Sequence, residues 1–295
     1  MFIVTLVAAD RLTKDDIYSA GVILDQSFVY AQHFSWIDEG SAADLECDGF
    51  AHDLPAIRAA IDGKLPGIDV IVQPQEGRRK RLLVADMDST MITVECIDEL
   101  ADYAGVKAEV AEITERAMRG ELAFEEALRA RVALLTGLPA ETIDRCREER
   151  VRLTPGAGQL VRTMRRDGAL TVLVSGGFTR FADPVGEEIG FERVVANRLV
   201  VENGCLTGEV ELPIVGAEAK RLALVAGREE RGLAAEDTLA VGDGANDIPM
   251  LREAGLGVAF HAKPAAAEAA GARIVHNDLT ALLYAQGYRK AEWAD

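Results

Sequence analysis

The sequence contains few of the residues from which zinc sites and disulfide frameworks are built. Its 295 residues include four cysteines and four histidines, and neither type forms a C-x-x-C-like pair. Scattered thiols of this kind are typical of reduced cysteines and not of a secreted disulfide scaffold. We therefore expect a cytoplasmic protein without a zinc centre.

Basic residues are also scarce. Lysine and arginine number 32 against 49 acidic residues, which gives a net charge of −17 and a pI near 4.7. This balance argues against nucleic acid or an anionic membrane as a partner, and no apolar run approaches membrane-spanning length. The apolar start, Met1 to Ala9, lacks the basic region of a signal peptide and predicts a strand. Any site for an anionic substrate must therefore be locally positive.

One apolar stretch runs directly into two aspartates. Residues 82–85 have the pattern of a buried parallel strand, and Asp86 and Asp88 follow it, with Ser89 and Thr90 behind them. Open α/β sheets bind ligands at this edge. Two adjacent carboxylates in one crevice repel each other unless a hard cation such as Mg²⁺ neutralises them. Taken alone, such a stretch is more commonly a strand end with a polar turn.

Two later strands end in polar loops of the same kind. Residues 169–174 run into Ser175-Gly176-Gly177, whose glycines allow backbone N–H groups to approach a phosphate. Residues 238–241 run into Gly242-Asp243-Gly244-Ala245-Asn246-Asp247, and Lys220 lies on a predicted helix between the two loops. Each feature alone is commonly a turn or a surface lysine. Because the carboxyl ends of parallel strands meet at one edge of a sheet, together they predict a single site.

The order of predicted elements suggests three units. From residue 154 onward, alternating strands and helices predict an α/β fold with a mostly parallel sheet and helices on both faces. Period-3.6 spacing predicts four short helices inserted after the first core strand, as a cap over the sheet edge. The first residues follow the order β-α-β-β-α-β of the ferredoxin-like motif, and a polar linker suggests that this unit is separable. The expected units are residues 1–75, a core of 76–95 and 154–295, and a helical cap of 96–153.

Three further local elements are predicted: a helix, a hairpin turn and a strand. Thr154-Pro155 has the signature of a helix start, and Gly168 that of its end. Asn203-Gly204 predicts the turn of a β-hairpin. A strand is predicted over residues 28–34.

The motifs together resemble those of the haloacid-dehalogenase-type phosphatases. Asp86-x-Asp88-Ser89-Thr90, Ser175-Gly-Gly, Lys220 and Gly242-Asp243-Gly-x-Asn246-Asp247 have the order and spacing of that superfamily. Three stretches resemble its phosphoserine phosphatase branch: Glu95-Cys-Ile-Asp98-Glu99, Phe124-x-x-x-Leu128-x-x-Arg131-Val132 and Ala196-Asn197-Arg198-Leu199. The resemblance covers about residues 82 to 284. The region before it resembles ACT-type regulatory domains, in element order alone.

The resemblance implies a Mg²⁺-dependent enzyme that hydrolyses O-phosphoserine to serine and phosphate, the last step of serine biosynthesis. Asp86 would be the nucleophile that forms an aspartyl-phosphate, and Asp88 the general acid and base. Mg²⁺ would be held by Asp86, the Asp88 backbone carbonyl and Asp243. The implied substrate contacts are Ser175, Gly176, Lys220 and Asn246 for the phosphate, and Glu95 and Arg131 for the amino-acid group. Asp247 would support the site by orienting Lys220 or a metal-bound water.

Other functions remain open. The same chemistry could act on a different small phosphomonoester or pass the phosphoryl group to another alcohol. Paired aspartates also suit a phospho-accepting signalling module, although that leaves the helical cap without a use. The N-terminal unit could make the protein an amino-acid sensor. As partners we expect a small-molecule substrate, a second copy of the chain in a homodimer, and an amino-acid effector at the N-terminal unit.

Overall fold

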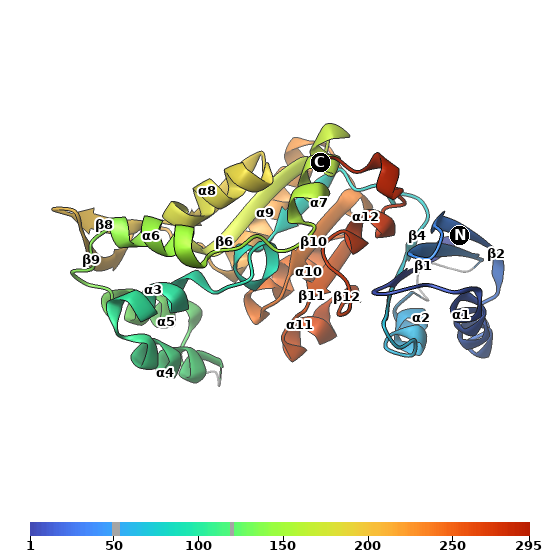
Figure 1. Ribbon diagram of the computed structural model, residues 1–295, viewed down its shortest axis with the longest axis horizontal. Coiled ribbons are helices and arrows are strands. Elements are labelled where there is room, and N and C mark those ends of the chain that lie inside the picture. The colour runs from blue at the N-terminus through green and yellow to red at the C-terminus, as the bar shows by residue number, and fades with distance from the viewer. Residues whose placement is uncertain (49–53, 119–120) are drawn as a thin grey trace.

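The computed structural model describes residues 1–48, 54–118 and 121–295. Figure 1 shows the N-terminal unit in blue at one end and the helices α3 to α5 in green at the other. The long parallel sheet lies between them. The N-terminus lies within the N-terminal unit, and the C-terminus lies beside α7 in the parallel-sheet unit.

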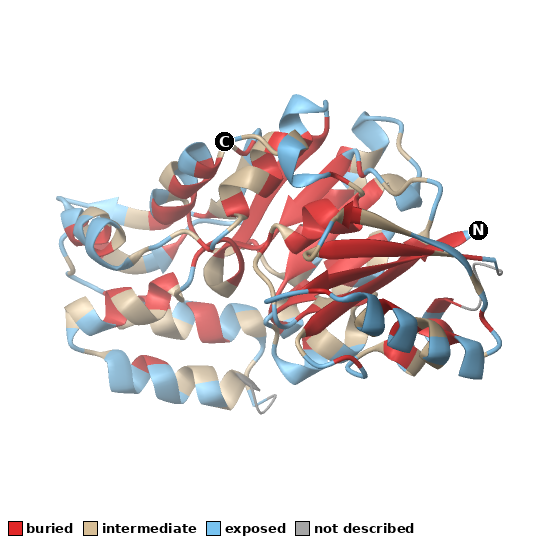
Figure 2. Cartoon of the chain, turned by 45° about the vertical axis from the view of Figure 1, so that its right-hand side comes forward, coloured by how far each residue is buried: buried red, intermediate tan, exposed pale blue. Residues whose placement is uncertain are grey.

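The N-terminal unit is a four-stranded antiparallel sheet in the order β2-β3-β1-β4, and two helices pack on one of its faces (Figure 2). This confirms the ferredoxin-like order. Thr13 begins the first helix because its hydroxyl accepts the N–H of Asp16, whose carboxylate accepts the N–H of Thr13 in return. The second strand starts three residues later than predicted, since Phe28 takes a φ of 58° in the turn before it. The elements are β1 (Phe2–Ala8), α1 (Lys14–Gln26), β2 (Ala31–Asp38), β3 (Ala42–Cys47), α2 (Leu54–Ile61) and β4 (Ile68–Pro74).

The second sheet has six parallel strands in the order β12-β11-β10-β5-β6-β7. This confirms the predicted α/β core. Its strands are β5 (Leu82–Ala85), β6 (Leu170–Phe178), β7 (Arg193–Asn197), β10 (Thr238–Gly242), β11 (Leu256–Phe260) and β12 (Ala272–Ile274). Its helices are α7 (Ala157–Arg166), α8 (Thr179–Ile189), α9 (Ala217–Glu230), α10 (Ile248–Glu253), α11 (Pro264–Ala269) and α12 (Ala281–Ala285).

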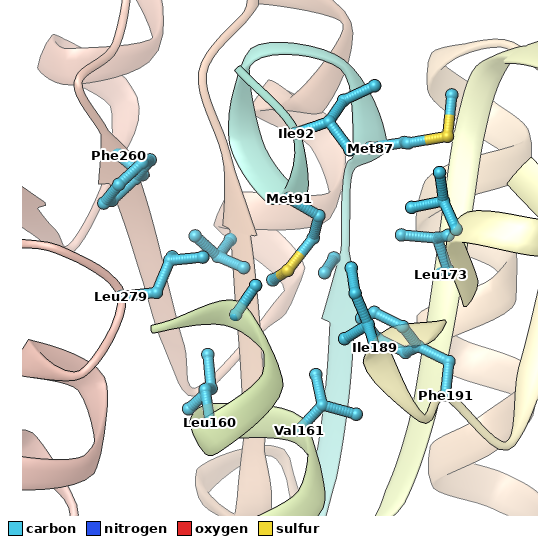
Figure 3. Packing of buried hydrophobic residues seen from close by; sticks show 14 of the residues in the cluster. Met87, Met91, Ile92, Leu160, Val161, Leu173, Ile189, Phe191, Phe260 and Leu279 are labelled. Carbon is cyan, nitrogen blue, oxygen red and sulfur yellow. The ribbon is translucent and has the colours of Figure 1, made fainter. Parts of the chain in front are cut away.

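Alternation along the strands builds a core on each face of this sheet. In β5, Leu83 and Ala85 join the cluster that α7, α8 and α12 cover, while Leu82 and Val84 join the cluster under α9, α10 and α11. Figure 3 shows part of the first cluster, with side chains of α7 packed beneath the turn that follows β5. Burial on both faces explains why these strands are continuous apolar runs.

Some element boundaries differ from the predictions. The helix expected from Thr154-Pro155 begins at Ala157 with Gly156 as its N-cap. Thr154 instead lies in the chain returning from the cap, where its N–H donates to the carbonyl of Met91 in the chain that leads into the cap. Gly156 has a φ of 83°, and a Cβ there would lie 2.6 Å from the Thr280 nitrogen, so glycine is required. Strand β6 continues to Phe178, through the three residues that were expected to end it.

Four helices lie between β5 and β6, as expected of the cap. They are α3 (Cys96–Ala104), α4 (Lys107–Met118), α5 (Phe124–Ala133) and α6 (Glu141–Arg150). The two chains that connect them to the sheet are paired, since Thr93 N–H donates to the Arg152 carbonyl. The predicted hairpin is present as β8 (Leu199–Glu202) and β9 (Cys205–Val210), and it bonds to the loop between α5 and α6 through Gly137 N–H and the Leu206 carbonyl. A segment from late in the chain therefore packs with these helices.

The N-terminal unit shares a core with the parallel sheet. Val7, Ile37 and Ile71 belong to the same buried cluster as the residues beneath α7 and α12. Arg78, in the supposed linker, donates to the Asp44 carboxylate at 2.7 Å and to the Ala285 carbonyl at 2.9 Å. We therefore no longer expect the unit to be separable, because the interface buries Arg78 and Asp44, charged residues that a polar linker and a surface strand would leave in solvent.

Removing residues 1–75 should produce a fragment that is insoluble or melts at a much lower temperature. The deletion uncovers the apolar surface beneath Val7, Ile37 and Ile71, and each large side chain contributes about 1.5–3 kcal/mol when fully buried. Thermal unfolding of the full chain and the fragment, prepared side by side, measures the effect. A soluble fragment with the melting temperature of the full chain would contradict the shared core.

Candidate active site

The polar loops of the parallel sheet meet at one cavity of about 680 Å³ between the sheet edge and the cap. Asp86 and Asp88 follow β5, Gly176 lies near the end of β6, and Asp243 and Asn246 follow β10. All five line the cavity. From the cap side come Glu95, Asp98, Phe124, Leu128 and Arg131. The structure thus brings seven of the predicted site residues to one cavity, whereas Ser175, Lys220 and Asp247 are fully buried and do not line it.

Three buried carboxylates and one buried lysine form the floor of the site. One oxygen from each of Asp86, Asp243 and Asp247 lies within 4.8 Å of the others. Lys220 is fully buried, and its Nζ lies 2.6 Å from Asp86 Oδ1 and 2.7 Å from Asp247 Oδ1. Burial alone would lower the pKa of Lys220, but Asp247 and Asp86 outweigh it and raise that pKa, so the group is an ammonium.

Asp88 lies in a tight turn that aims it into the cavity. The turn is fixed at its start by the Asp86 N–H, which donates to the Val241 carbonyl at 3.0 Å, and Ser89 within it has a φ of 55°. The first N–H of helix α3, that of Cys96, donates to Asp88 Oδ1 at 3.3 Å. Burial and the nearby Glu95 raise the pKa of Asp88 to about 7. A carboxyl group with such a pKa can both give and take a proton near neutral pH.

The Ser175-Gly176-Gly177 segment is held by its own side chain and by a residue of β7. Ser175 Oγ accepts the N–H of Gly177 at 2.8 Å, and Asn197 Nδ2 donates to the Gly176 carbonyl at 2.8 Å. A Cβ on Gly177 would lie 2.9 Å from Asp88 Oδ2, so the close approach requires glycine. Asn197 lies in the stretch Ala196-Asn197-Arg198-Leu199, which resembles the phosphatase family, but the sequence did not predict that its side chain holds the Gly176 carbonyl.

Glu95 and Arg131 line the cavity from its cap side. Glu95 directly precedes α3, and its Oε1 accepts the Ser89 hydroxyl at 3.0 Å. Arg131 on α5 donates to the Ala127 carbonyl at 3.2 Å and to Thr114 Oγ1 at 3.4 Å. Burial lowers its pKa, and the attraction of Asp98 and Glu95 only partly offsets this, since no carboxylate of the described residues lies within ion-pair distance. A mostly buried guanidinium in this state is suited to an anionic group of a ligand.

Two charged residues of the cavity were missed in the sequence. Lys263 follows β11, and its Nζ lies 3.4 Å from Asp243 Oδ2 and 3.6 Å from Glu95 Oε1. Lys263 could have been predicted in the same way as the other loops, because it follows the carboxyl end of β11, a parallel strand of the same sheet. Asp98 lies one helical turn after Glu95, and burial raises its pKa. The spacing of the two acids in the sequence already placed them on one face of a helix.

The donor set fits a hard divalent cation. Six carboxylates, those of Asp86, Asp88, Glu95, Asp98, Asp243 and Asp247, are offset by three cations, Lys220, Lys263 and Arg131. Burial raises the pKa values of Asp86 and Asp243, which shows that their charged forms are under-compensated. Oxygen ligands in this number are those that Mg²⁺ takes.

A parallel sheet with an acidic centre at its carboxyl edge, covered by helices inserted after β5, defines a capped α/β hydrolase. The chain belongs to the haloacid dehalogenase-like hydrolases, whose family model matches residues 83–252. In the described part of the chain, no helix has the length and apolar character needed to cross a membrane.

Relatives of known name agree with this assignment. The chain is 41% identical over 290 residues to a phosphoserine phosphatase of Streptomyces coelicolor, a match that covers 98% of this chain and 68% of that protein. It is 45% identical over 218 residues to one of Archaeoglobus fulgidus, covering 73% of this chain and 63% of that protein. The chain thus spans about two thirds of the length of these relatives. A solved phospho-aspartyl intermediate analogue of phosphoserine phosphatase aligns with a TM-score of 0.65 at 42% identity, over 70% of this chain and 98% of that one.

Proposed function

We propose that the protein is a Mg²⁺-dependent phosphoserine phosphatase that releases serine and phosphate, the last step of serine biosynthesis. The observation that carries the proposal is Arg131, a mostly buried guanidinium in the same cavity as Asp86 and Asp88, with no carboxylate of the described residues within ion-pair distance. A phosphatase for simple phosphate esters has no use for a second anion-binding group on the cap. Phosphoserine carries both a phosphate and a carboxylate. The names of the relatives support the same substrate.

Asp86 would act as the nucleophile. Its carboxylate lies at the end of β5 and is oriented by Lys220 at 2.6 Å. An Asp86 oxygen would attack phosphorus in line, forming an acyl phosphate as the bond to the serine oxygen breaks. Asp88, with its pKa raised to about 7, would give its proton to that oxygen. It would then take a proton from the water that attacks phosphorus and frees both phosphate and Asp86.

The other residues would bind and orient the substrate. The phosphate would be bound by Ser175, the Gly176 N–H, Lys220 and Asn246. These groups would form the locally positive region that an anionic substrate needs in an acidic chain. Arg131 would bind the substrate carboxylate and Glu95 its ammonium group. Mg²⁺ would be held by Asp86, the Asp88 backbone carbonyl and Asp243, and when bound it would offset the negative charge of the transferring phosphoryl group. Asp247, which contacts Lys220 at 2.7 Å, would keep that ammonium on Asp86.

Phosphate release from a panel of phosphomonoesters, with and without Mg²⁺, tests the proposal. We expect phosphoserine to be the best substrate, and activity to need the metal. Preference for an ester without an amino-acid group would contradict the substrate assignment. Product analysis with an added acceptor alcohol separates hydrolysis from phosphoryl transfer. Slow release over minutes would instead favour a phospho-accepting signalling module.

Replacing Mg²⁺ by Ca²⁺ should inhibit the enzyme. Ca²⁺ accepts seven or eight oxygen ligands and can take both oxygens of Asp86, which would remove the nucleophile from its line of attack. Steady-state rates with each ion as the sole divalent metal measure the effect. Comparable rates would show that Asp86 is not both ligand and nucleophile.

We also propose that the protein is a homodimer through its N-terminal unit, which would be an ACT-type domain with an amino-acid effector. Among the described residues, β2 pairs with β3 alone and forms an edge of the sheet. The aromatic side chains of Phe28, Tyr30 and Phe34, in and before β2, are 85%, 58% and 39% exposed. Such an edge suits a second copy of the chain. Light scattering on the full chain gives the mass, and a monomer would contradict the proposal.

We also propose a cytoplasmic location for the protein, since all four cysteines are free thiols.

A further inference from the structure

Lys263 occupies a position between the core and the cap. Its ammonium lies 3.4 Å from Asp243 Oδ2, in the floor of the site, and 3.6 Å from Glu95 Oε1, at the start of the cap. The backbone N–H of Lys263 also donates to the Asp243 carbonyl at 2.9 Å. One residue thus contacts Asp243 through both main chain and side chain.

Lys263 also leaves one oxygen of Glu95 for a ligand. Glu95 Oε1 takes the Ser89 hydroxyl and faces Lys263 Nζ, whereas no described residue bonds to Oε2. The carboxylate is therefore held by one oxygen while the other remains available to an ammonium group. Without the lysine, Glu95 and Asp243 would repel each other, and Glu95 would be held by a single hydroxyl.

The loop that carries Lys263 is fastened at its other end. His261, where β11 ends, has a φ of 43°, and its N–H donates to the Ile274 carbonyl at 2.9 Å. Its ring Nε2 lies 3.0 Å from the carbonyl oxygen of Asn277, within hydrogen-bond distance. The direction of the loop therefore depends on where the chain following β12 lies.

That chain is held by the N-terminal unit. Asp69 on β4 is only 3% exposed, and its carboxylate accepts the N–H groups of Val275, His276 and Asn277 at 2.9 to 3.2 Å. The side-chain amide of Asn277 donates to the same carboxylate at 2.8 Å and to the Val7 carbonyl at 3.0 Å. In Figure 1, β4 lies on the side of the molecule where β12 forms the edge of the parallel sheet. A buried carboxylate with four donors fixes this junction firmly.

We propose that Lys263 is a further positioning residue of the active site, and that Asp69 of the N-terminal unit fixes the loop that carries it. The proposal rests on phosphoserine being the substrate. The N-terminal unit then contributes to catalysis without reaching the cavity, through Asp69, Asn277 and His261. Its specific effect falls on Glu95, which binds only substrates that bear an ammonium group.

The test compares kcat/KM for phosphoserine with kcat/KM for an aryl phosphate, which makes no use of Glu95. Lys263→Met should lower the ratio of the two by about five-fold, the size expected for a half-exposed ion pair, and Lys263→Arg should restore most of it. Asp69→Asn keeps the shape of the side chain but loses its charge, and should lower the ratio in the same direction.

Arg78→Met is the matched control for Asp69→Asn. Arg78 also fastens the N-terminal unit, through Asp44 and the Ala285 carbonyl, but it does not touch the 275–277 segment. Both variants should lower the melting temperature, and only Asp69→Asn should change the substrate ratio. If Asp69→Asn does not fold, His261→Asn loosens the same loop from the core side and tolerates the positive φ.

A double variant decides whether Asp69 acts through Lys263. In the Lys263→Met background, Asp69→Asn should leave the substrate ratio where Lys263→Met alone put it. Additive losses, or an equal change with Arg78→Met, would show a general loss of structure and overturn the proposal. An unchanged ratio in Lys263→Met would overturn it as well. A wild-type enzyme that hydrolyses the aryl phosphate but not phosphoserine would instead refute the proposed function.

Discussion

Asp86→Asn should abolish phosphate release, by at least about 10⁴-fold, because an amide has the shape of the carboxylate but is not a competent nucleophile. The fold should persist, since the amide oxygen can still accept from Lys220, which lies 2.6 Å from the carboxylate in the native chain. Phosphate release at saturating Mg²⁺ measures the loss, and the melting temperature checks the fold.

The matched control is Asp183→Asn, which makes the same change on the exposed surface of α8. This variant should keep wild-type activity. Mass spectrometry of the Asp86→Asn preparation excludes deamidation back to aspartate as a source of residual rate. Activity above a trace in the verified variant would show that another group is the nucleophile.

Arg131→Ala should lower kcat/KM for phosphoserine by orders of magnitude. Without the guanidinium, the substrate carboxylate is desolvated and unpaired, a loss of roughly 2–5 kcal/mol by analogy with truncating one partner of a buried charge pair. An aryl phosphate lacks this carboxylate, so its rate should barely change. The two substrates are to be assayed together on wild type and variant.

Arg129→Ala controls for effects on the helix, since Arg129 is exposed on α5 two residues earlier. It should leave both substrates unaffected. An equal fall on both substrates in Arg131→Ala would place Arg131 in the shared phosphate machinery or in the fold. The argument for substrate selection by the cap would then fail.

The centre of the parallel core was predictable because β5, β6 and β10 are buried apolar runs that end in polar loops. Strand β5 and the loop after β10 show this clearly, and the rule that ligands bind at the carboxyl edge then places Asp86 and Asp243 together. Strand β7 was missed because it is an edge strand with alternating exposure and no continuous apolar run. Because β7 was not predicted, its last residue, Asn197, was not expected to contact the loop at the end of β6.

Charged residues were the main source of error. Lys220 has the local sequence of a surface lysine, and only the other motifs assigned it to the site; it is fully buried, since its partners come from distant loops. Arg78 lies in the predicted polar linker, and Asp69 was given no role in the sequence analysis, yet both bond across the interface to the core. Periodicity shows which face of an element is apolar, but it does not show which charges find a buried partner.

The central claim is that Asp86 becomes phosphorylated during turnover. The direct measurement is to quench the enzyme in acid during the reaction with phosphoserine, reduce the acyl phosphate with borohydride, and locate the modification by peptide mass spectrometry. The account predicts homoserine at position 86, dependent on substrate and absent from Asp86→Asn. Modification at another residue, or turnover with no trapped species at all, would contradict it.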